Sequence, residues 1–466
     1  MSVPNISKVP SKARKAPEKI EKMQPLLPFL HETPKGKPPR PPAQRKKQFE
    51  FDLAVVGLGY VGLPTSLAFR ERGHRVLGID ASQARLKSIL NQRADLVDED
   101  RERLARALTD PTFQVTSDPS LLSRAAAVVV CVPTPVDQYL VPDLTILRTA
   151  CESVVMNAVP GQLFILTSTT YVGSTWDLLG APLAGRGLTA GTDVYVAFSP
   201  ERINPGTDLY AHEDVPRVVG GLTAACSAAA AALLSTSVKQ IHRVLNAETA
   251  EMTKLVENTF RAVNIALANE FADICHALKL NVKDVIEAAA TKPYGFMPFI
   301  PGPGVGGHCI PCDPHYLLWQ MKKERLHSPV IEQAMNAISL RPRRVIERAI
   351  HALSEHDVNM HAAKILVVGV AYKPDVADIR QSPALEILAG LITEGANVTY
   401  HDLRFENITL PNGHVLRGVE EPSSVGADLT ILHTAHSDVG LDWLADERIV
   451  LDTTYQLTDL PHLVRP

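Results

Sequence analysis

A predicted strand followed at once by three spaced glycines leaves this chain few ways to fold. Residues 51–56 form an apolar run with β-branched side chains, which is typical of a buried parallel strand. The run leads into a G-x-G-x-x-G sequence that opens a predicted helix over residues 64–72. In this pattern the first glycine permits a tight turn, the second lets backbone approach a pyrophosphate, and the third lets helix pack on strand. The helix N-terminus then favours the anion. We therefore predict a dinucleotide site at Gly57, Gly59, Tyr60, Val61 and Gly62.

The acid that ends the next predicted strand indicates which dinucleotide binds. The strand over residues 74–79 ends in Asp80, 23 residues beyond Gly57. A carboxylate there can bind both ribose hydroxyls and would repel a 2′-phosphate, so NAD is favoured over NADP. The alternative for Asp80 alone is a solvated acid at a strand end. Residues 302–307 also fit G-x-G-x-x-G, but the three prolines within 292–301 exclude a central strand before them.

Further strands predict an α/β protein. Predicted strands over 126–132, 162–166 and 194–197 alternate with helical stretches, which indicates a doubly wound parallel sheet with its ligand at the carboxyl ends of the strands. Thr134, Thr169 and Glu201 follow these strands. Each alone is more often a turn or cap residue, but together we expect them at one edge of the sheet.

A second unit repeats the order strand, turn, helix, strand. Its predicted elements cover residues 364–370, 383–393 and 397–401, with later strands over 428–433 and 449–453, and it lacks the triple glycine. Lys373 and Arg380 near its first turn suit a phosphate-bearing ligand other than a second dinucleotide, or are ordinary surface charges.

Between the two units, residues 247–278 predict one long helix free of glycine and proline. Lys254 and Asn258 lie four residues apart and therefore on one face, and Glu251 and Arg261 extend that stripe. The stripe is either a solvated face with ion pairs or a pair of donors, Lys254 and Asn258, for a developing oxyanion.

A glycine-rich loop then ends in a thiol. Cys309 shares the loop 301–314 with Asp313, and we interpret it as a candidate nucleophile. Cys309 and Cys312 form a C-x-x-C, but no small redox βαβ domain surrounds it and no second ligand pair has zinc spacing, so we predict no metal. The remaining cysteines lie in apolar strands or helices and are expected in the core: Cys131, Cys151, Cys226 and Cys275.

Charge divides the chain into two parts. Residues 1–50 carry 12 Lys and Arg against 4 Asp and Glu, with 10 of the 35 prolines, while the remaining 416 residues carry 35 against 47. The first part predicts a disordered tail, either without specific function or attracted to an anionic membrane surface or an acidic partner. The acidic remainder excludes a nucleic-acid protein. No apolar run approaches the ~20 residues of a membrane span, and neither a secretory signal nor a disulfide framework is evident, so we expect a cytoplasmic protein.

Six motifs in order resemble the UDP-glucose/GDP-mannose dehydrogenase family over residues 51–466. They are Gly-Leu-Gly-Tyr-Val-Gly-Leu-Pro (57–64), Cys-Val-Pro-Thr-Pro (131–135), Ser-Pro-Glu-Arg (199–202), Lys-Leu-Val-Glu-Asn (254–258), Gly-Gly-His-Cys-Ile-Pro (306–311), and Tyr-Lys-Pro-Asp with Arg-Gln-Ser-Pro (372–383). The resemblance implies two Rossmann-like doubly wound domains joined by a long central helix, behind the tail. We expect a tail over 1–50, an NAD-binding domain over 51–245, a central helical domain over 246–345 and a UDP-sugar-binding domain over 346–466.

The resemblance implies two NAD-dependent oxidations of a UDP-sugar C6 alcohol to the carboxylate, for cell-surface polysaccharide synthesis, by a homodimer or higher oligomer that pairs through the central helix. Cys309 would carry a thiohemiacetal and then a thioester. Lys254 and Asn258 would stabilise the C6 oxygen, Asp313 would exchange protons or position water, and Glu201 with Thr169 would assist hydrolysis. Cofactor contacts would add Arg85, Thr134, Thr169 and Arg380 to the glycine loop and Asp80. Substrate contacts would be Glu201, Lys254, Asn258, Phe299, Gly306 and Lys373.

Shorter sequence segments indicate which branch of the family the chain resembles and where it departs from the family pattern. Residues 288–296 are similar to the UDP-N-acetylglucosamine 6-dehydrogenase branch, with UDP-glucose or UDP-N-acetylmannosamine as alternatives. Cys312 replaces an expected aliphatic residue, so oxidation with Cys309 is a hypothesis for inactivation. Two alternative functions are considered. A two-electron hydroxyacid dehydrogenase needs no cysteine, and a non-catalytic nucleotide-sugar sensor would lose Cys309 or Lys254.

Overall fold

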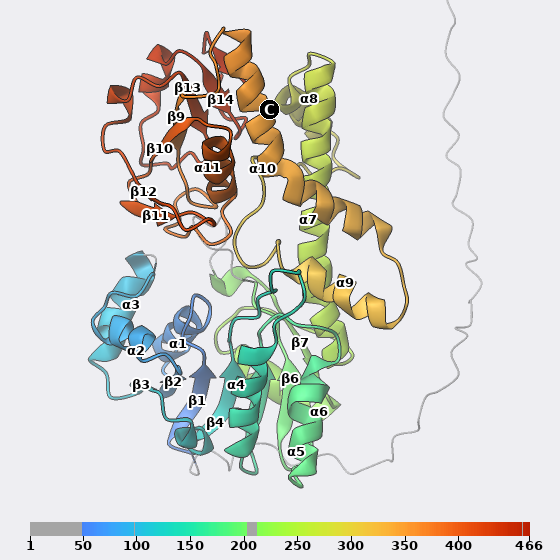
Figure 1. The fold of residues 1–466 in the computed structure, drawn as a ribbon. Coiled ribbons are helices and arrows are strands. Elements are labelled where there is room, and N and C mark those ends of the chain that lie inside the picture. Colours follow the sequence, from blue (N-terminus) through green and yellow to red (C-terminus); the bar gives the residue numbers. More distant parts are fainter. Residues whose placement is uncertain (1–48, 97, 203–211, 459) are drawn as a thin grey trace, which may run out of the picture. The chain divides into compact units, whose positions relative to one another are not determined.

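The structure is a computed structural model that describes residues 49–96, 98–202, 212–458 and 460–466 (Figure 1). The predicted tail lies outside the described residues, except for its last two positions. Within the described ranges, no helix is both long enough and apolar enough to cross a membrane.

The first unit is built on an eight-stranded sheet in the order β3-β2-β1-β4-β5-β6-β7-β8. The end of β1 pairs in register with the ends of its two neighbours, because Val56 lies opposite Ile79 and Val130. This register brings the carboxyl ends of the central strands to one edge. Two clusters of buried apolar side chains cover the two faces of the sheet. The strands are β1 (Phe51–Val56), β2 (Val76–Ile79), β3 (Phe113–Thr116), β4 (Ala125–Val130), β5 (Leu163–Leu166), β6 (Tyr195–Phe198), β7 (Arg217–Gly221) and β8 (Ile241–Arg243).

The sheet departs from the predicted all-parallel arrangement at one edge. β7 runs antiparallel to β6, and β8 then pairs parallel with β7. Parallel neighbours need a crossover over a face of the sheet, whereas an antiparallel neighbour can follow a connection that stays at one end. Hydrophobic periodicity predicted neither β7 nor β8, because β7 has only two large apolar residues, Val218 and Val219, and β8 has only three residues.

Helices cover both faces of this sheet, as expected for a doubly wound unit. The helix predicted over 64–72 begins two residues earlier, at the third glycine. A π-helical turn, Trp176–Gly180, leads directly into α5. The helices are α1 (Gly62–Glu71), α2 (Gln83–Leu90), α3 (Asp98–Leu108), α4 (Thr145–Met156), α5 (Ala181–Gly185) and α6 (Ala224–Leu234).

The central part is helical. The predicted long helix is confirmed as α7 (Ala247–Ala277), which Asn246 caps by accepting a hydrogen bond from the backbone N–H of Thr249. It is followed by α8 (Val282–Ala290), α9 (Asp313–Lys323) and α10 (Pro329–Glu355). Figure 1 shows α10 between α7 and α11, and it packs against both. The expected domain border at 345 falls inside α10, which continues through Pro342.

The second unit holds a five-stranded parallel sheet in the order β10-β9-β13-β14-β15. Its first turn repeats that of the first unit: the N–H of Gly369 donates to His401 O at 2.8 Å, as that of Gly57 donates to Ile79 O at 2.8 Å. A separate two-stranded antiparallel sheet also belongs to this unit. The elements are β9 (Lys364–Val368), α11 (Pro383–Thr393), β10 (Asn397–His401), β11 (Asn407–Thr409), β12 (Val415–Arg417), β13 (Leu429–Leu432), β14 (Val450–Asp452) and β15 (Leu463–Val464).

Candidate active site

The three glycines after β1 meet three different steric demands. Gly57 has φ +89°, and a side-chain carbon there would lie 2.6 Å from the carbonyl oxygen of Cys131. The same atom at Gly62 would lie 1.8 Å from the carbonyl oxygen of Gly57, while at Gly59 it would have no neighbour within 4 Å. The outer two glycines are therefore required by close packing. The middle one leaves its side of the loop open, as approach of a pyrophosphate requires.

Asp80 and Arg85, which follow β2 in the chain, hold this loop in place through hydrogen bonds to its backbone. The Asp80 carboxylate accepts hydrogen bonds from the backbone N–H groups of Leu58 and Ser82, both at 2.8 Å. Arg85 Nε donates to Leu58 O at 2.8 Å, and its guanidinium pairs with Asp95. Arg85 Nη2 is buried without a partner among the described residues. A carboxylate retains further lone pairs after two bonds, so Asp80 and Arg85 together still offer an acceptor and a donor to a bound ligand.

Two predicted residues lie after the two strands that come next to β1 in the sheet order, β4 and then β5. Thr134 follows β4 and Thr169 follows β5, and both side chains are half-buried. On the other side of the glycine loop, Tyr60 lies close enough to Arg380 and Tyr372 for the charges of these groups to affect its pKa, which burial raises. The first turn of the C-terminal unit therefore lies beside the glycine loop.

Cys309 lies at the surface just before α9. The backbone N–H groups of Cys312 and Asp313 donate to Cys309 O at 3.2 and 2.8 Å, which forms a tight turn into the helix. The Cys309 side chain is exposed, whereas Cys312 is buried beside the amide of Gln381. The oxidation hypothesis for this pair stays a prediction. The other four cysteines are buried, as predicted.

Asp313, the first residue of α9, is only 3 % exposed. The Asn258 amide donates to its carboxylate. Burial raises the pKa of Asp313 to about 6, although Lys254 and hydrogen bonds with Asn258 and Thr169 act in the opposite direction. Three segments far apart in sequence therefore meet at one carboxyl group that titrates near neutrality, and such groups cluster at functional sites.

The charges around Cys309 have opposite effects on its thiol. The surrounding protein raises the pKa of Cys309, and the carboxylate of Asp313 adds to this effect. Lys254, Arg261 and Arg380 lower it. These groups come from α7, α9 and the C-terminal unit, so the thiol lies where all of them converge.

Lys254 and Asn258 do not lie on a solvated face, which excludes that interpretation of the stripe. Lys254 is half-buried, and its Nζ donates to the backbone carbonyl of Glu201 at 2.8 Å. Asn258 and Glu251 are 5 % and 1 % exposed. Only Arg261 of the four is exposed.

Glu201 has a charged partner that the sequence did not indicate. Its carboxylate pairs with Arg217 of β7 at 2.7 Å, and Arg217 is 4 % exposed. The backbone N–H of Arg202 donates to the other carboxylate oxygen at 2.8 Å. The pair explains how an acid can be buried here. No sequence signal identified Arg217, because β7 itself was not predicted.

The C-terminal unit packs directly on the glycine-rich loop. A side-chain carbon at Gly306 would lie 2.6 Å from Tyr372 Cβ and 2.7 Å from Gln381 O. The N–H of Gly307 donates to Arg380 O at 3.1 Å. Glycine is therefore needed at 306 so that the loop can pack against the C-terminal unit. From the sequence, Gly306 was predicted to be among the substrate contacts.

Three further residues were predicted to contact a ligand, Arg380 for the cofactor and Lys373 and Phe299 for the substrate. Arg380 forms a bidentate ion pair with Asp378, with Nη2 to Oδ2 at 2.6 Å. Lys373 is half-buried in the same segment. Phe299 packs edge to face against Phe260 of α7, with ring centroids 6.0 Å apart.

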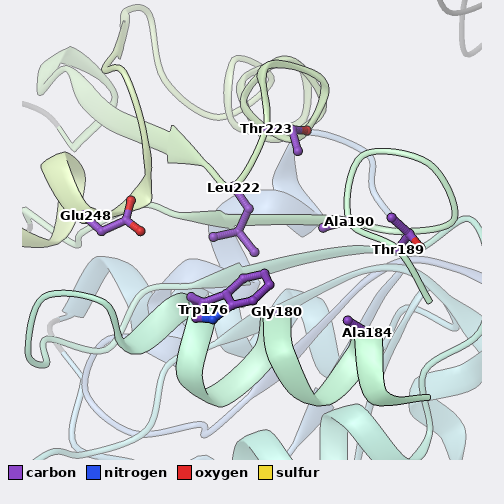
Figure 2. Close-up of a pocket in the computed structure, with 8 residues that line it drawn as sticks. All are labelled: Trp176, Gly180, Ala184, Thr189, Ala190, Leu222, Thr223 and Glu248. Atoms are coloured by element: carbon purple, nitrogen blue, oxygen red, sulfur yellow. The ribbon is translucent and has the colours of Figure 1, made fainter. Parts of the chain in front are cut away.

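A separate hollow of about 250 Å³ lies in the first unit (Figure 2). Trp176, Leu222 and Glu248 are among its lining residues. It includes none of the predicted site residues. No group of three or more His, Cys, Asp or Glu side chains placed to hold a metal occurs in the part of the chain that the structure describes.

Fold and site together define a dehydrogenase built from two wound units around a central helix. Models of the NAD-binding, central and UDP-binding domains of the UDP-glucose/GDP-mannose dehydrogenase family match residues 51–238, 248–337 and 366–459. The chain belongs to this family, and it is an NAD-dependent nucleotide-sugar dehydrogenase.

Three relatives show how far the similarity extends. A UDP-N-acetyl-D-mannosamine dehydrogenase of Methanocaldococcus jannaschii is 34 % identical over 83 % of this chain and 86 % of its own length. An NDP-N-acetyl-D-galactosaminuronic acid dehydrogenase of Ralstonia solanacearum is 32 % identical over 86 % and 95 %. The solved structure of a UDP-D-N-acetylmannosamine dehydrogenase from Pyrococcus horikoshii has a TM-score of 0.80 and 32 % identity, covering 89 % of this chain and 98 % of that one.

Proposed function

We propose that the protein oxidises the C6 alcohol of a UDP-sugar to the carboxylate in two NAD-dependent steps, with Cys309 as the covalent nucleophile. The observation that carries this proposal is the exposed Cys309 thiol at the point where Lys254, Asn258, Asp313 and Thr169 converge. A two-electron dehydrogenase needs no such thiol. A non-catalytic sensor would have no need of a buried acid that titrates near neutrality.

NAD, when bound, accepts a hydride from C6 in each oxidation. In the first, the hydroxyl proton leaves and an aldehyde forms. Cys309 sulfur then adds to the aldehyde carbon as a thiolate, and the oxygen takes up a proton to give a thiohemiacetal. Loss of the second hydride and of that proton gives a thioester. Water adds to it, the C–S bond breaks, and the acid and the thiol are released. One water and two hydride transfers account for the four-electron oxidation.

The residues around the thiol have roles that follow from their positions. Lys254 and Asn258 would stabilise negative charge on the C6 oxygen, since both bear N–H donors on one side of α7. Asp313, with a pKa of about 6, suits proton exchange near neutral pH. Thr169 would orient the water, and Glu201, held by Arg217, would assist hydrolysis.

Binding is divided between the two wound units. The glycine loop with Asp80, Arg85, Thr134 and Thr169, all within the domain proposed over 51–245, would hold NAD together with Arg380 of the C-terminal domain. Gly306, Phe299 and Lys373 would hold the UDP-sugar where the central part meets the domain proposed over 346–466. These residues present charged, backbone and aromatic groups of the kinds that a nucleotide sugar needs.

The sugar is best proposed as N-acetylmannosamine. Residues 288–296 suggested N-acetylglucosamine, but the relatives from Methanocaldococcus and Pyrococcus are named for N-acetylmannosamine. Since these relatives match most of the chain, they outweigh one short segment. A cytoplasmic location, a homodimer and a role in polysaccharide synthesis stay predictions.

The test is an NADH assay with UDP-N-acetylmannosamine, UDP-N-acetylglucosamine, UDP-glucose and GDP-mannose. We expect two NADH per UDP-N-acetylmannosamine and a kcat/KM at least about tenfold above that for the other sugars. Cys309→Ala should abolish acid formation, with Cys275→Ala as a buried-cysteine control. Acid formation with two NADH by Cys309→Ala would contradict the covalent mechanism, and preference for another sugar would contradict only the choice of substrate.

A further inference from the structure

Glu251 lies one turn before Lys254 in α7, and its buried carboxylate accepts four hydrogen bonds. The backbone N–H groups of Gly173 and Thr175 donate to it at 2.6 and 2.8 Å. The hydroxyls of Ser174 and Thr175 donate to it at 2.9 and 2.6 Å. All four donors belong to the loop that follows β5. Glu251 therefore attaches this loop to the helix that carries Lys254.

The position of the loop explains how a carboxylate is stabilised there. Residues 173–175 come directly before the π-helical turn Trp176–Gly180 and α5. Their backbone N–H groups form the N-terminus of that helical segment, where the free donors and the helix dipole favour an anion. Hydrogen bonds to a charged acceptor are stronger than those between neutral groups. The attachment is thus strong and also directional.

The same loop is attached to α9 on its other side. The Gln320 amide accepts from the backbone N–H of Val172 at 2.9 Å and donates to Val172 O at 2.8 Å. Next to this pair, Tyr171 packs edge to face against Trp319, with centroids 5.7 Å apart. Gln320 and Trp319 lie in the helix that Asp313 opens. The loop thus connects the helix of Lys254 to the helix of Asp313.

We propose that Glu251, together with Gln320, is a positioning residue that sets the Thr169 hydroxyl against the Asp313 carboxylate. Thr169 is the half-buried residue at the start of this loop, and its side chain lies near enough to Asp313 to lower the pKa of that carboxyl. Displacement of a reacting group by about 1 Å can cost up to about 100-fold in rate. The inference rests on the proposed function, because it concerns the geometry of the reaction at Cys309.

Glu251→Gln tests the proposal. The glutamine keeps the size of the side chain, but its NH₂ group must face one of the N–H or O–H donors, so the loop loses at least one bond. We expect kcat to fall about tenfold while KM for NAD and for the UDP-sugar stays within about twofold. Glu152→Gln, at an exposed glutamate of α4, is the matched control and should leave both constants unchanged.

A double-mutant cycle with Thr169→Val separates positioning from general damage. If Glu251 acts through Thr169, Glu251→Gln should cost less than about twofold in kcat once the hydroxyl is absent. A full tenfold loss in the Thr169→Val background would overturn the proposal, as would a wild-type kcat for Thr169→Val. Gln320→Glu places a carboxylate oxygen against Val172 O, so it should lower kcat as Glu251→Gln does. If Glu251→Gln does not fold, Gln320→Glu replaces it in the double-mutant cycle. Failure of the proposed function is distinct, because the wild-type enzyme would then form no NADH with any UDP-sugar.

Discussion

At the scale of single residues, the surroundings of a side chain change its pKa and therefore its chemistry. In the sequence, Asp313 is only an acid in the loop 301–314, and the structure shows that it begins α9. Packing between α7 and the loop after β5 buries it and raises its pKa from 3.8 to about 6. Lys254, which lowers that pKa, hydrogen-bonds to the backbone of Glu201. The proposed proton-transfer group is therefore a product of its neighbours.

We expect the rate of the enzyme to fall as the pH decreases through about 6, because Asp313 then becomes protonated. Asp313→Asn should be slower by about 100-fold and lack this inflection. The folded-state pKa lies above the unfolded value, so the contribution of this group to stability is complete below about pH 4 and is lost as the pH rises through about 6. Rates measured from pH 5 to 9 test the assignment, and an unchanged inflection in the variant would refute it.

At the scale of elements, buried Arg341 links α10 to three other segments. Its Nε donates to Gly302 O at 3.0 Å, its Nη1 pairs with Asp273 of α7 at 2.6 Å, and its Nη2 donates to the Tyr455 hydroxyl at 3.2 Å. Tyr455 follows β14 and packs with apolar residues of α7 and α8. This network gives both Arg341 and Tyr455 a structural role.

Arg341→Met should lower the free energy of unfolding by about 2–3 kcal/mol, because it leaves Gly302 O and the Tyr455 hydroxyl without this donor. Chemical denaturation followed by fluorescence measures the change. Arg343→Met, at a side chain 76 % exposed in the same helix, is the control and should change stability by less than about 0.5 kcal/mol. Equal effects of the two substitutions would show that the network contributes nothing.

At the scale of the whole molecule, α7 presents an apolar stripe to solvent. Its members recur at intervals of 4, 7, 4, 3 and 4 residues and so lie on one side of the helix: Val256, Phe260, Leu267, Phe271, Ile274 and Leu278. All are at least 45 % exposed. Exposed apolar side chains gathered on one side of a helix are typical of an interaction surface, which supports the predicted homodimer.

Phe271→Glu should convert the dimer to a monomer, since it places a charge at the middle of the stripe, where desolvating it is costly. Light scattering coupled to gel filtration gives the mass directly. Leu245→Glu is the matched control, because Leu245 is 91 % exposed but precedes α7 and lies outside the stripe. A dimer mass for Phe271→Glu, or a monomer mass for the wild-type protein, would contradict the prediction.

Most of the fold was predictable because its signals are local. Every predicted strand is present, with ends within two residues of the prediction. The missed strands β3, β8 and β15 are short and lie at sheet edges, and β11 and β12 form the small antiparallel pair. The buried strand β7 was missed because it has only two large apolar residues beside an arginine and two glycines. The reversal at β7 depends on how the chain returns to the sheet, which no local pattern encodes.

The sequence by itself determined the wound architecture and the glycine turn for NAD, and it singled out Cys309 as the candidate nucleophile, since each needs only neighbouring residues in a fixed order. The tertiary structure alone decided which side chains act together. Glu251 became a buried acceptor, Arg217 became the partner of Glu201, and Asp313 gained a pKa near neutrality, because each effect arises between residues that are far apart in the sequence, from 16 residues for Glu201 and Arg217 to 144 for Thr169 and Asp313. Desolvation and pairing depend on what surrounds a group in space, and that is set only when the chain has folded.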